Sequence, residues 1–268
     1  MSIPEFFDIH THIFPDRLAP VAVYNLGKFY DFPVLGKGTS ENLADTCAAN
    51  GIKGMLILLT STNPRSMHAV NEGGKSMLEY MKNAGFDAFV FGGYHQDCEN
   101  PERELEYAVE NGLTGFKLHP DMQKCDIDDE RFFPLYEFCR GKYPIYFHMG
   151  DNRSEYRYSE AKKLLKVLEK FPGLRVGAAH LGGYNAWDEA TVLAGHPDVW
   201  FDTSSTISRT GPGKASELIH LFGPDRCMFG TDYPVVTAAE EIPLFMALDL
   251  TDEERRNIAC INAKHFLM

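Results

Sequence analysis

The sequence has no excess of positive charge and no long hydrophobic run. Among its 268 residues, 26 lysines and arginines stand against 38 aspartates and glutamates, which gives a net charge of -12. This balance argues against the basic surface that nucleic-acid-binding proteins use. The apolar runs are short, for example Met55 to Leu59, whereas a membrane-spanning helix needs roughly 20 apolar residues. We therefore expect neither a nucleic-acid partner nor a membrane span.

Cysteine is also sparse, and its pattern indicates no disulfide framework. The six cysteines are scattered and form no C-x-x-C pair, and a chain of this length can build a core without disulfides. We expect reduced thiols. Residues 1–8 contain Glu5 and Asp8 and no basic stretch followed by an apolar one, so a cleaved secretory signal is not expected. Together these features predict a cytoplasmic protein.

No linker, charge run or low-complexity segment divides the chain, so one domain is expected over residues 1–268. Eight short β-rich runs occur at 5–9, 54–58, 88–92, 113–118, 144–147, 174–179, 199–202 and 226–230. Segments with helical spacing lie between them. A strand followed by a helix, repeated eight times over about 250 residues, predicts an α/β fold of one kind, a single parallel (β/α)8 barrel, or TIM barrel.

Local signals predict where some helices begin and end. Apolar residues at positions 161, 164, 165 and 168 form the stripe of a half-buried helix, for which Ser159 is a candidate cap. Thr251 and Glu254, three residues apart, have the spacing of a capping box at the start of the last helical region.

A long excursion from Ile13 to Ser40 directly follows the first predicted strand. It contains five aromatic residues, at positions 14, 24, 29, 30 and 32. In a barrel this segment lies on the catalytic face. Its aromatic residues form either a lid or pocket wall, or simply pack on the barrel rim, and the sequence leaves both interpretations open.

Side chains suited to metal binding stand at the ends of four predicted strands. His10 and His12 are two residues apart, so strand geometry points both to one face. His148, His180 and Asp232 end the fifth, sixth and eighth strand candidates, where barrel active sites are built. Imidazole nitrogens and a carboxylate suit Zn²⁺ or a similar divalent ion. The alternative is a set of structural histidines with a capping aspartate.

The motifs around these residues occur in an order that resembles a known family. They are Phe-Asp-Ile-His-Thr-His-Ile-Phe-Pro (7–15), Gly-Phe-Lys-Leu-His-Pro (115–120), Tyr-Phe-His-Met-Gly (146–150), Ala-His-Leu-Gly-Gly (179–183), Phe-Asp-Thr-Ser (201–204) and Phe-Gly-Thr-Asp-Tyr-Pro (229–234). The sequence resembles the metal-dependent amidohydrolase superfamily, and within it the amidohydrolase 2 branch. That branch includes aminocarboxymuconate semialdehyde decarboxylase, resorcylate decarboxylases, related hydratases and several lactonases.

The resemblance implies a role for each of these side chains. His10, His12, His148 and Asp232 would hold one divalent metal ion, with Zn²⁺ expected first and Mn²⁺, Fe²⁺ or Co²⁺ as alternatives. Asp232 would also orient the attacking water. His180 would be catalytic without binding that metal, and would move a proton or polarise the substrate.

Lys117 and His119 share one face of the fourth predicted strand. In binuclear members of the superfamily a carboxylated lysine on this strand bridges two metal ions. The amidohydrolase 2 branch instead implies one metal and an unmodified lysine near the site, which is the interpretation we favour, with a second metal as the alternative. His119 is a candidate pocket residue or a hydrogen-bonded structural one.

Three arginines follow the fifth and seventh predicted strands: Arg153, Arg157 and Arg209. Arginines on such loops can bind a carboxylate through paired N–H donors, although each alone could also be a solvated surface residue. We predict that at least one of them contacts an anionic substrate.

The leading hypothesis is a hydrolase in which a metal-activated water attacks an amide, lactone or ester carbonyl of a small, anionic substrate. A non-oxidative decarboxylase of a small aromatic or unsaturated acid would use the same site, and is the alternative. A barrel that binds metal or ligand without catalysis is a third hypothesis. The expected partner is a small molecule, and a homodimer stays open, with Tyr184 or Trp187 as candidate contacts.

Overall fold

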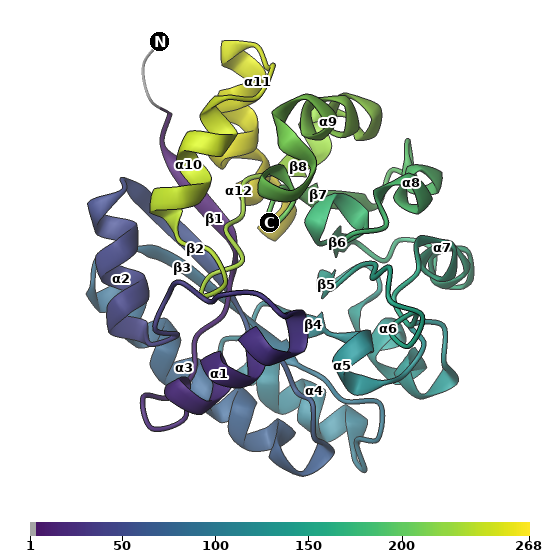
Figure 1. The fold of residues 1–268 in the computed structure, drawn as a ribbon. Coiled ribbons are helices and arrows are strands. Elements are labelled where there is room, and N and C mark those ends of the chain that lie inside the picture. The colour runs from purple at the N-terminus through teal and green to yellow at the C-terminus, as the bar shows by residue number, and fades with distance from the viewer. Residues whose placement is uncertain (1–3) are drawn as a thin grey trace.

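The computed structural model describes residues 4–268, and its centre is one sheet of eight parallel strands that are paired in chain order (Figure 1). Residues 1–3 of the N-terminal segment considered above lie outside the described part. The strands are β1 (Phe6–Thr11), β2 (Ile52–Leu58), β3 (Asp87–Gly93), β4 (Gly115–Leu118), β5 (Ile145–Phe147), β6 (Val176–Ala178), β7 (Val199–Asp202) and β8 (Cys227–Met228). Every predicted strand is confirmed.

Helices alternate with the strands and surround them. They are α1 (Ala19–Tyr30), α2 (Ser40–Ala49), α3 (Met67–Asn83), α4 (Pro101–Glu110), α5 (Pro120–Gln123), α6 (Phe133–Cys139), α7 (Ala161–Lys170), α8 (Trp187–Ala190), α9 (Ile207–Phe222), α10 (Ala238–Met246), α11 (Asp252–Arg256) and α12 (Asn262–Leu267). The predicted (β/α)8 barrel is therefore confirmed. None of the helices in residues 4–268 has the length and apolar character to cross a membrane.

Backbone hydrogen bonds join β1 to the chain that follows β8 and so bring the two ends of the sheet together. The amide of Ile9 donates to the Phe229 carbonyl (3.0 Å), and the amide of Asp232 donates to the His10 carbonyl (2.9 Å). His12 donates in the same way to Tyr233. These bonds fix Asp232 beside His10 and His12, although more than 200 residues separate Asp232 from the two histidines in the sequence.

Apolar side chains fill the barrel interior. The ring of Phe266 in α12 lies 5.8 Å from Tyr146, 6.2 Å from Phe91 and 6.0 Å from Trp200, measured between ring centroids. The same interior cluster contains Phe7, near the start of β1. All six cysteines are free thiols, and five of them are buried. Because the interior is packed in this way, polar side chains gather at the ends where the strands finish.

The excursion after β1 contains a helix, α1, which the sequence analysis did not predict. In Figure 1, α1 lies in the lower front part of the view, between α3 and α5. Its apolar spacing is irregular and two of its larger side chains, Val21 and Tyr24, are 60% and 70% exposed, so no clear buried stripe marks it in the sequence. Phe14, Phe29 and Tyr30 line a cavity, which confirms the interpretation as a pocket wall for three of the five aromatic residues; Tyr24 and Phe32 are not among the lining residues.

The two helix-start predictions had different outcomes. The capping box at Thr251 and Glu254 is present at the start of α11. Ser159 does not cap α7: the helix begins at Ala161 with Glu160 as its cap residue, and no side chain caps it. The Ser159 hydroxyl instead donates to Asp121 Oδ2 (2.5 Å). A buried carboxylate competes successfully for this hydroxyl, and only the tertiary structure brings the two together.

Candidate metal centre

His10, His12 and Asp232 converge at the end of the barrel where the strands finish. His10 lies in β1 and is 1% exposed, His12 follows the strand, and Asp232 follows β8. The Nε2 atoms of the two histidines are 3.1 Å apart, and Asp232 Oδ1 lies 3.4 Å from the first and 3.7 Å from the second. The donor atoms of this trio lie within 4.8 Å of one another, close enough to share one metal ion.

The outer hydrogen bonds of these histidines determine what their inner nitrogens offer. His10 Nδ1 lies 2.9 Å from a carboxylate oxygen of Asp202, and His12 Nδ1 lies 2.7 Å from the carbonyl oxygen of Leu58. These oxygens only accept, so both imidazoles carry their proton on Nδ1. Two nitrogen lone pairs and the Asp232 carboxylate then face one another without a proton between them. A divalent cation fits this arrangement, because it binds lone pairs that otherwise repel.

Asp202 connects several residues of the centre through hydrogen bonds. It is fully buried and accepts hydrogen bonds from the His10 imidazole, the His180 amide (3.1 Å), the Ser204 hydroxyl and the Tyr146 hydroxyl (2.5 Å). Burial alone would raise the pKa of Asp202, but His10, His180 and the Ser204 hydrogen bond together bring that pKa below its usual value. Asp202 is therefore a fixed carboxylate that orients the histidine ligands.

His180 lies beside this trio and contacts His148. Its Nδ1 is 3.0 Å from the Ser204 carbonyl oxygen, so its proton is on Nδ1 and its Nε2 is an acceptor. That Nε2 lies 3.1 Å from His148 Nδ1. The centroids of the His10 and His180 rings are 5.1 Å apart. The His180 ring thus contacts His148 and also lies near His10.

His148 belongs to a second cluster rather than to the first. The structure groups it with His119 and Asp121, whose donor atoms also lie within 4.8 Å of its own. The His119 and His148 rings stack with centroids 4.1 Å apart, and His148 Nε2 lies 3.9 Å from Asp121 Oδ2. This buried nitrogen has no hydrogen-bond partner within residues 4–268. Three of the four sequence-predicted ligands therefore converge, and the fourth, His148, contacts His180 instead.

Lys117 points into the barrel from β4 and is 1% exposed. Its Nζ has no hydrogen-bond partner in the described chain and lies 5.2 Å from the centre of the Tyr146 ring. Burial lowers the pKa of Lys117 to about 8, against the opposing pull of Asp202 and Asp232. A buried amine without such a partner fits a nearby ligand or a modification of the amine.

His119 is bound on both sides. It caps α5 by accepting from the Met122 amide at Nδ1 (3.4 Å), and its Nε2 lies 2.8 Å from the Tyr30 hydroxyl. With Nδ1 as acceptor, Nε2 carries the proton and donates to Tyr30. The Tyr30 hydroxyl proton is then free to point elsewhere. This contact joins α1 to the site.

Burial keeps most of these histidines neutral. It is the largest cause that lowers the pKa of His12, His119 and His148 well below the usual range, and Lys117 and the neighbouring histidines, which disfavour a second positive charge, lower each pKa further. For His180, burial lowers the pKa to about 4. Neutral imidazoles are the form that binds divalent metals.

The three predicted arginines differ in what they contact. Arg153 donates to both oxygens of Asp151 and to the Phe29 carbonyl, and Arg157 is paired with Glu160 and Glu189. Arg209 makes no side-chain hydrogen bond or ion pair within residues 4–268. Its guanidinium lies 4.6 Å from the Tyr184 ring centre and 5.0 Å from that of Phe32.

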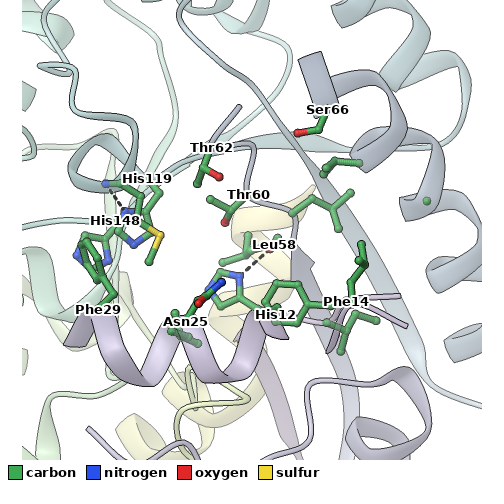
Figure 2. A pocket seen from close by; sticks show the side chains of 18 of the residues that line it. His12, Phe14, Asn25, Phe29, Leu58, Thr60, Thr62, Ser66, His119 and His148 are labelled. Atoms are coloured by element: carbon green, nitrogen blue, oxygen red, sulfur yellow. Dashed lines mark hydrogen bonds between the residues drawn. The ribbon is translucent and has the colours of Figure 1, made fainter. Parts of the chain in front are cut away.

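A cavity of about 700 Å³ opens onto the centre. His10, His12, His119, His148 and Asp232 all line it. Figure 2 shows His119 and His148 on one side of the cavity, Phe14 and Ser66 on the other, and His12 between them. A substrate in the cavity therefore has access to both clusters.

Asp202 and Tyr30 have roles at this site that the sequence alone does not indicate. Asp202 lies in the motif at 201–204, which marked its position without giving its contacts. Tyr30 was one of five aromatic residues in the excursion, and nothing in the sequence distinguishes it from the others. Its contact with His119, 89 residues away, exists only because α1 folds back over the barrel.

Comparison with known proteins supports the architecture. A family model described as amidohydrolase matches residues 8–267. An uncharacterised TIM-barrel protein from Bordetella bronchiseptica matches with a TM-score of 0.76 and 18% identity, over 98% of each chain.

Two similar solved structures are decarboxylases. A dihydroxybenzoic acid decarboxylase from a Polaromonas species, solved with manganese and 2-nitroresorcinol, matches with a TM-score of 0.72 and 16% identity, over 99% of this chain and 97% of that one. A 5-carboxyvanillate decarboxylase from Sphingomonas paucimobilis matches with a TM-score of 0.73 and 13% identity, over 99% of each chain. At these identities the similarity concerns the fold.

Proposed function

The chain belongs to the amidohydrolase family. From this membership we propose that it is a metal-dependent hydrolase, in which water attacks the carbonyl of a small, anionic amide, lactone or ester and the adjoining carbon–nitrogen or carbon–oxygen bond is broken. One observation carries the proposal: the Nε2 lone pairs of His10 and His12 and the Asp232 carboxylate all face one common point. Such a set is the donor chemistry of a catalytic divalent metal with positions left for water and substrate.

His10, His12 and Asp232 would hold the metal, and His148, the fourth ligand expected from the sequence, would bind it only in place of the present contact between its Nδ1 and His180 Nε2. Zn²⁺ is the first choice for this nitrogen and oxygen set, and Mn²⁺, Fe²⁺ or Co²⁺ are alternatives. When bound, the ion supplies Lewis acidity, which polarises a carbonyl oxygen and lowers the pKa of a water molecule. Asp202 and the Leu58 carbonyl keep the two imidazoles of β1 in the ligating tautomer.

His180 would receive the proton that the attacking water loses. Its Nε2 is an unprotonated acceptor, because Nδ1 donates to the Ser204 carbonyl. As water adds to the carbonyl carbon, one proton passes to Nε2; when the carbon–nitrogen or carbon–oxygen bond breaks, His180 returns that proton to the leaving atom. Asp232 orients the water, and Tyr30 directs its free hydroxyl proton to the substrate.

Decarboxylation is the second candidate, favoured by the similarity to solved decarboxylases. In that reaction His180 would have to donate a proton to carbon as CO₂ leaves. The bare Nε2 must first acquire that proton, which is why we place hydrolysis first.

The two reactions are separated by offering the purified enzyme two panels. One contains lactones, aryl esters and amides, with acid release followed at constant pH, and the other contains hydroxybenzoic acids, with CO₂ detected by mass spectrometry. We expect acid release and no CO₂, and we expect the same preparation of His10→Ala to do neither. Release of CO₂ alone would replace hydrolysis by decarboxylation.

Arg209 is the arginine we propose for binding the substrate's anionic group, because its guanidinium pairs with no carboxylate of the described residues, whereas those of Arg153 and Arg157 are held by carboxylates. We expect Arg209→Met to raise KM about 10- to 100-fold, the usual loss of a hydrogen bond to a charged group. Arg103→Met, on the exposed face of α4, is the matched control. An unchanged KM in Arg209→Met would remove this assignment.

A further inference from the structure

The cavity extends away from the histidines between two helices that each turn one face to it. On α1 the lining residues are Ala22, Asn25, Leu26 and Phe29, and on α3 they are Ala69, Val70, Gly73 and Met77. Within each set, the spacings of three and four residues place side chains on a single helix face. Most of these faces are apolar, in contrast to the polar histidine end of the same cavity (Figure 2).

The space between the two faces is not filled by the protein. Along α1, no other helix or strand of residues 4–268 makes an extensive backbone contact, and Leu18 at its start is 50% exposed. Apolar walls around an unfilled space favour an apolar occupant, because water there is less favourable than contact with carbon. At about 700 Å³, the cavity has the size used for drug-sized ligands rather than for a single-ring acid.

Two adjacent glycines of α3 show which side of the helix is open. A Cβ on Gly74 would lie 2.7 Å from Leu59 Cδ1 and 3.2 Å from Val90 Cγ1, so this glycine allows α3 to pack closely on the barrel. A Cβ on Gly73 would meet no heavy atom within 4 Å, and Gly73 lines the cavity. The absence of a side chain at Gly73 therefore widens the cavity without being required by packing.

We propose that the substrate carries an apolar chain or ring extension that lies between α1 and α3, with its reacting carbonyl at His12 and His148. This rests on the proposed function in one respect, namely that the histidine end is the reacting end. The substrate class is thus a carbonyl compound with a polar head and an extended apolar tail. The apolar faces of α1 and α3, including the open position of Gly73, select for the tail.

The test measures binding rather than turnover. Straight-chain hydroxamic acids, from acetohydroxamic to decanohydroxamic acid, have one metal-binding head and tails of increasing length. Their Kd values are measured by calorimetry on the metal-containing protein, below the concentration at which the longer members aggregate. We expect affinity to rise by up to about fourfold for each added methylene, as burial of one methylene group predicts.

Gly73→Leu shortens the space, and Gly213→Leu is its matched control. Gly213 lies in α9, is exposed, and has open space at its Cβ position, so the same substitution is made in a helix away from the cavity. We expect Gly73→Leu to leave acetohydroxamic acid binding unchanged and to weaken the longest members about tenfold or more, since the new side chain occupies their place. Ala22→Phe narrows the cavity from α1 and repeats the test if Gly73→Leu does not fold.

The series separates failure of this proposal from failure of the proposed function. Binding of acetohydroxamic acid with no dependence on tail length would overturn the apolar extension and leave the metal centre intact. A tail dependence that Gly73→Leu and Ala22→Phe both fail to alter would also overturn it. A tail dependence that these variants abolish, without binding of acetohydroxamic acid, would support the tail site while contradicting the metal-binding head.

Discussion

Protein purified without chelators is expected to contain about one equivalent of divalent metal per chain, and His10→Ala is expected to contain none. His10 Nε2 lies at the centre of the trio, within 3.1 Å of His12 Nε2 and 3.4 Å of Asp232 Oδ1. Replacing His10 removes one metal ligand and also removes the imidazole that donates a hydrogen bond to Asp202. Elemental mass spectrometry on the folded variant measures the loss.

The matched control is His265→Ala, because His265 lies exposed in α12. It should retain the metal content of the unmodified protein. Metal that persists in His10→Ala at the unmodified level would contradict the proposed centre and would point to the cluster of His119, Asp121 and His148, which does not contain His10.

A content of about two equivalents would instead support the binuclear alternative. Lys117 would then be the candidate bridging residue after carboxylation, because its buried amine has no hydrogen-bond partner among residues 4–268 and its pKa is lowered to about 8, which favours the neutral, reactive form. Lys117→Ala would reduce the content to one equivalent or less in that case, and would leave it unchanged if the centre holds a single metal.

His180→Asn is expected to lower kcat on the substrate found by the two panels about 100- to 10,000-fold, the usual contribution of a positioned acid or base. Asparagine is close in size but cannot take up a proton at this position. The metal content should stay at the unmodified level, because His180 is proposed to act without binding the metal. Measuring kcat and metal content on the same preparation separates a catalytic role from a ligating one.

His265→Asn is the control for this variant and should keep the unmodified kcat. Loss of metal together with activity in His180→Asn would make His180 a ligand, for which its 5.1 Å ring separation from His10 and its grouping with His10 and Asp202 give a structural basis. Normal kcat in a variant that retains its metal would remove His180 from the mechanism altogether.

The strand order and the barrel could be predicted from the sequence because their signals are local. Each strand is a short apolar run flanked by turn residues, and the alternation with helical spacing allows few architectures. The positions of His10, His12, His148, His180 and Asp232 at strand ends follow from the same pattern. So does their common location, because the ends of parallel strands meet on one face.

The contacts among those residues were decided by the tertiary structure. Backbone bonds between β1 and the chain after β8 place Asp232 beside His10, and the stacking of His148 on His119 draws it into a neighbouring cluster. Arg153 and Arg157 are occupied by carboxylates, which a sequence cannot reveal. Distances of a few ångströms between segments far apart in the chain depend on how the barrel closes.

The sequence by itself therefore determined the fold, the donor types and the face on which they gather. Only the folded chain decided which ring nitrogen of each imidazole carries the proton. The hydrogen-bond partners of His10, His12 and His180 are oxygens supplied by β7, β2 and the segment after β7. It also decided the position of α1 and the cavity that α1 forms with α3. These features depend on packing between helices and loops. Many sequences are compatible with one such packing arrangement, so no local periodicity in the sequence predicts it.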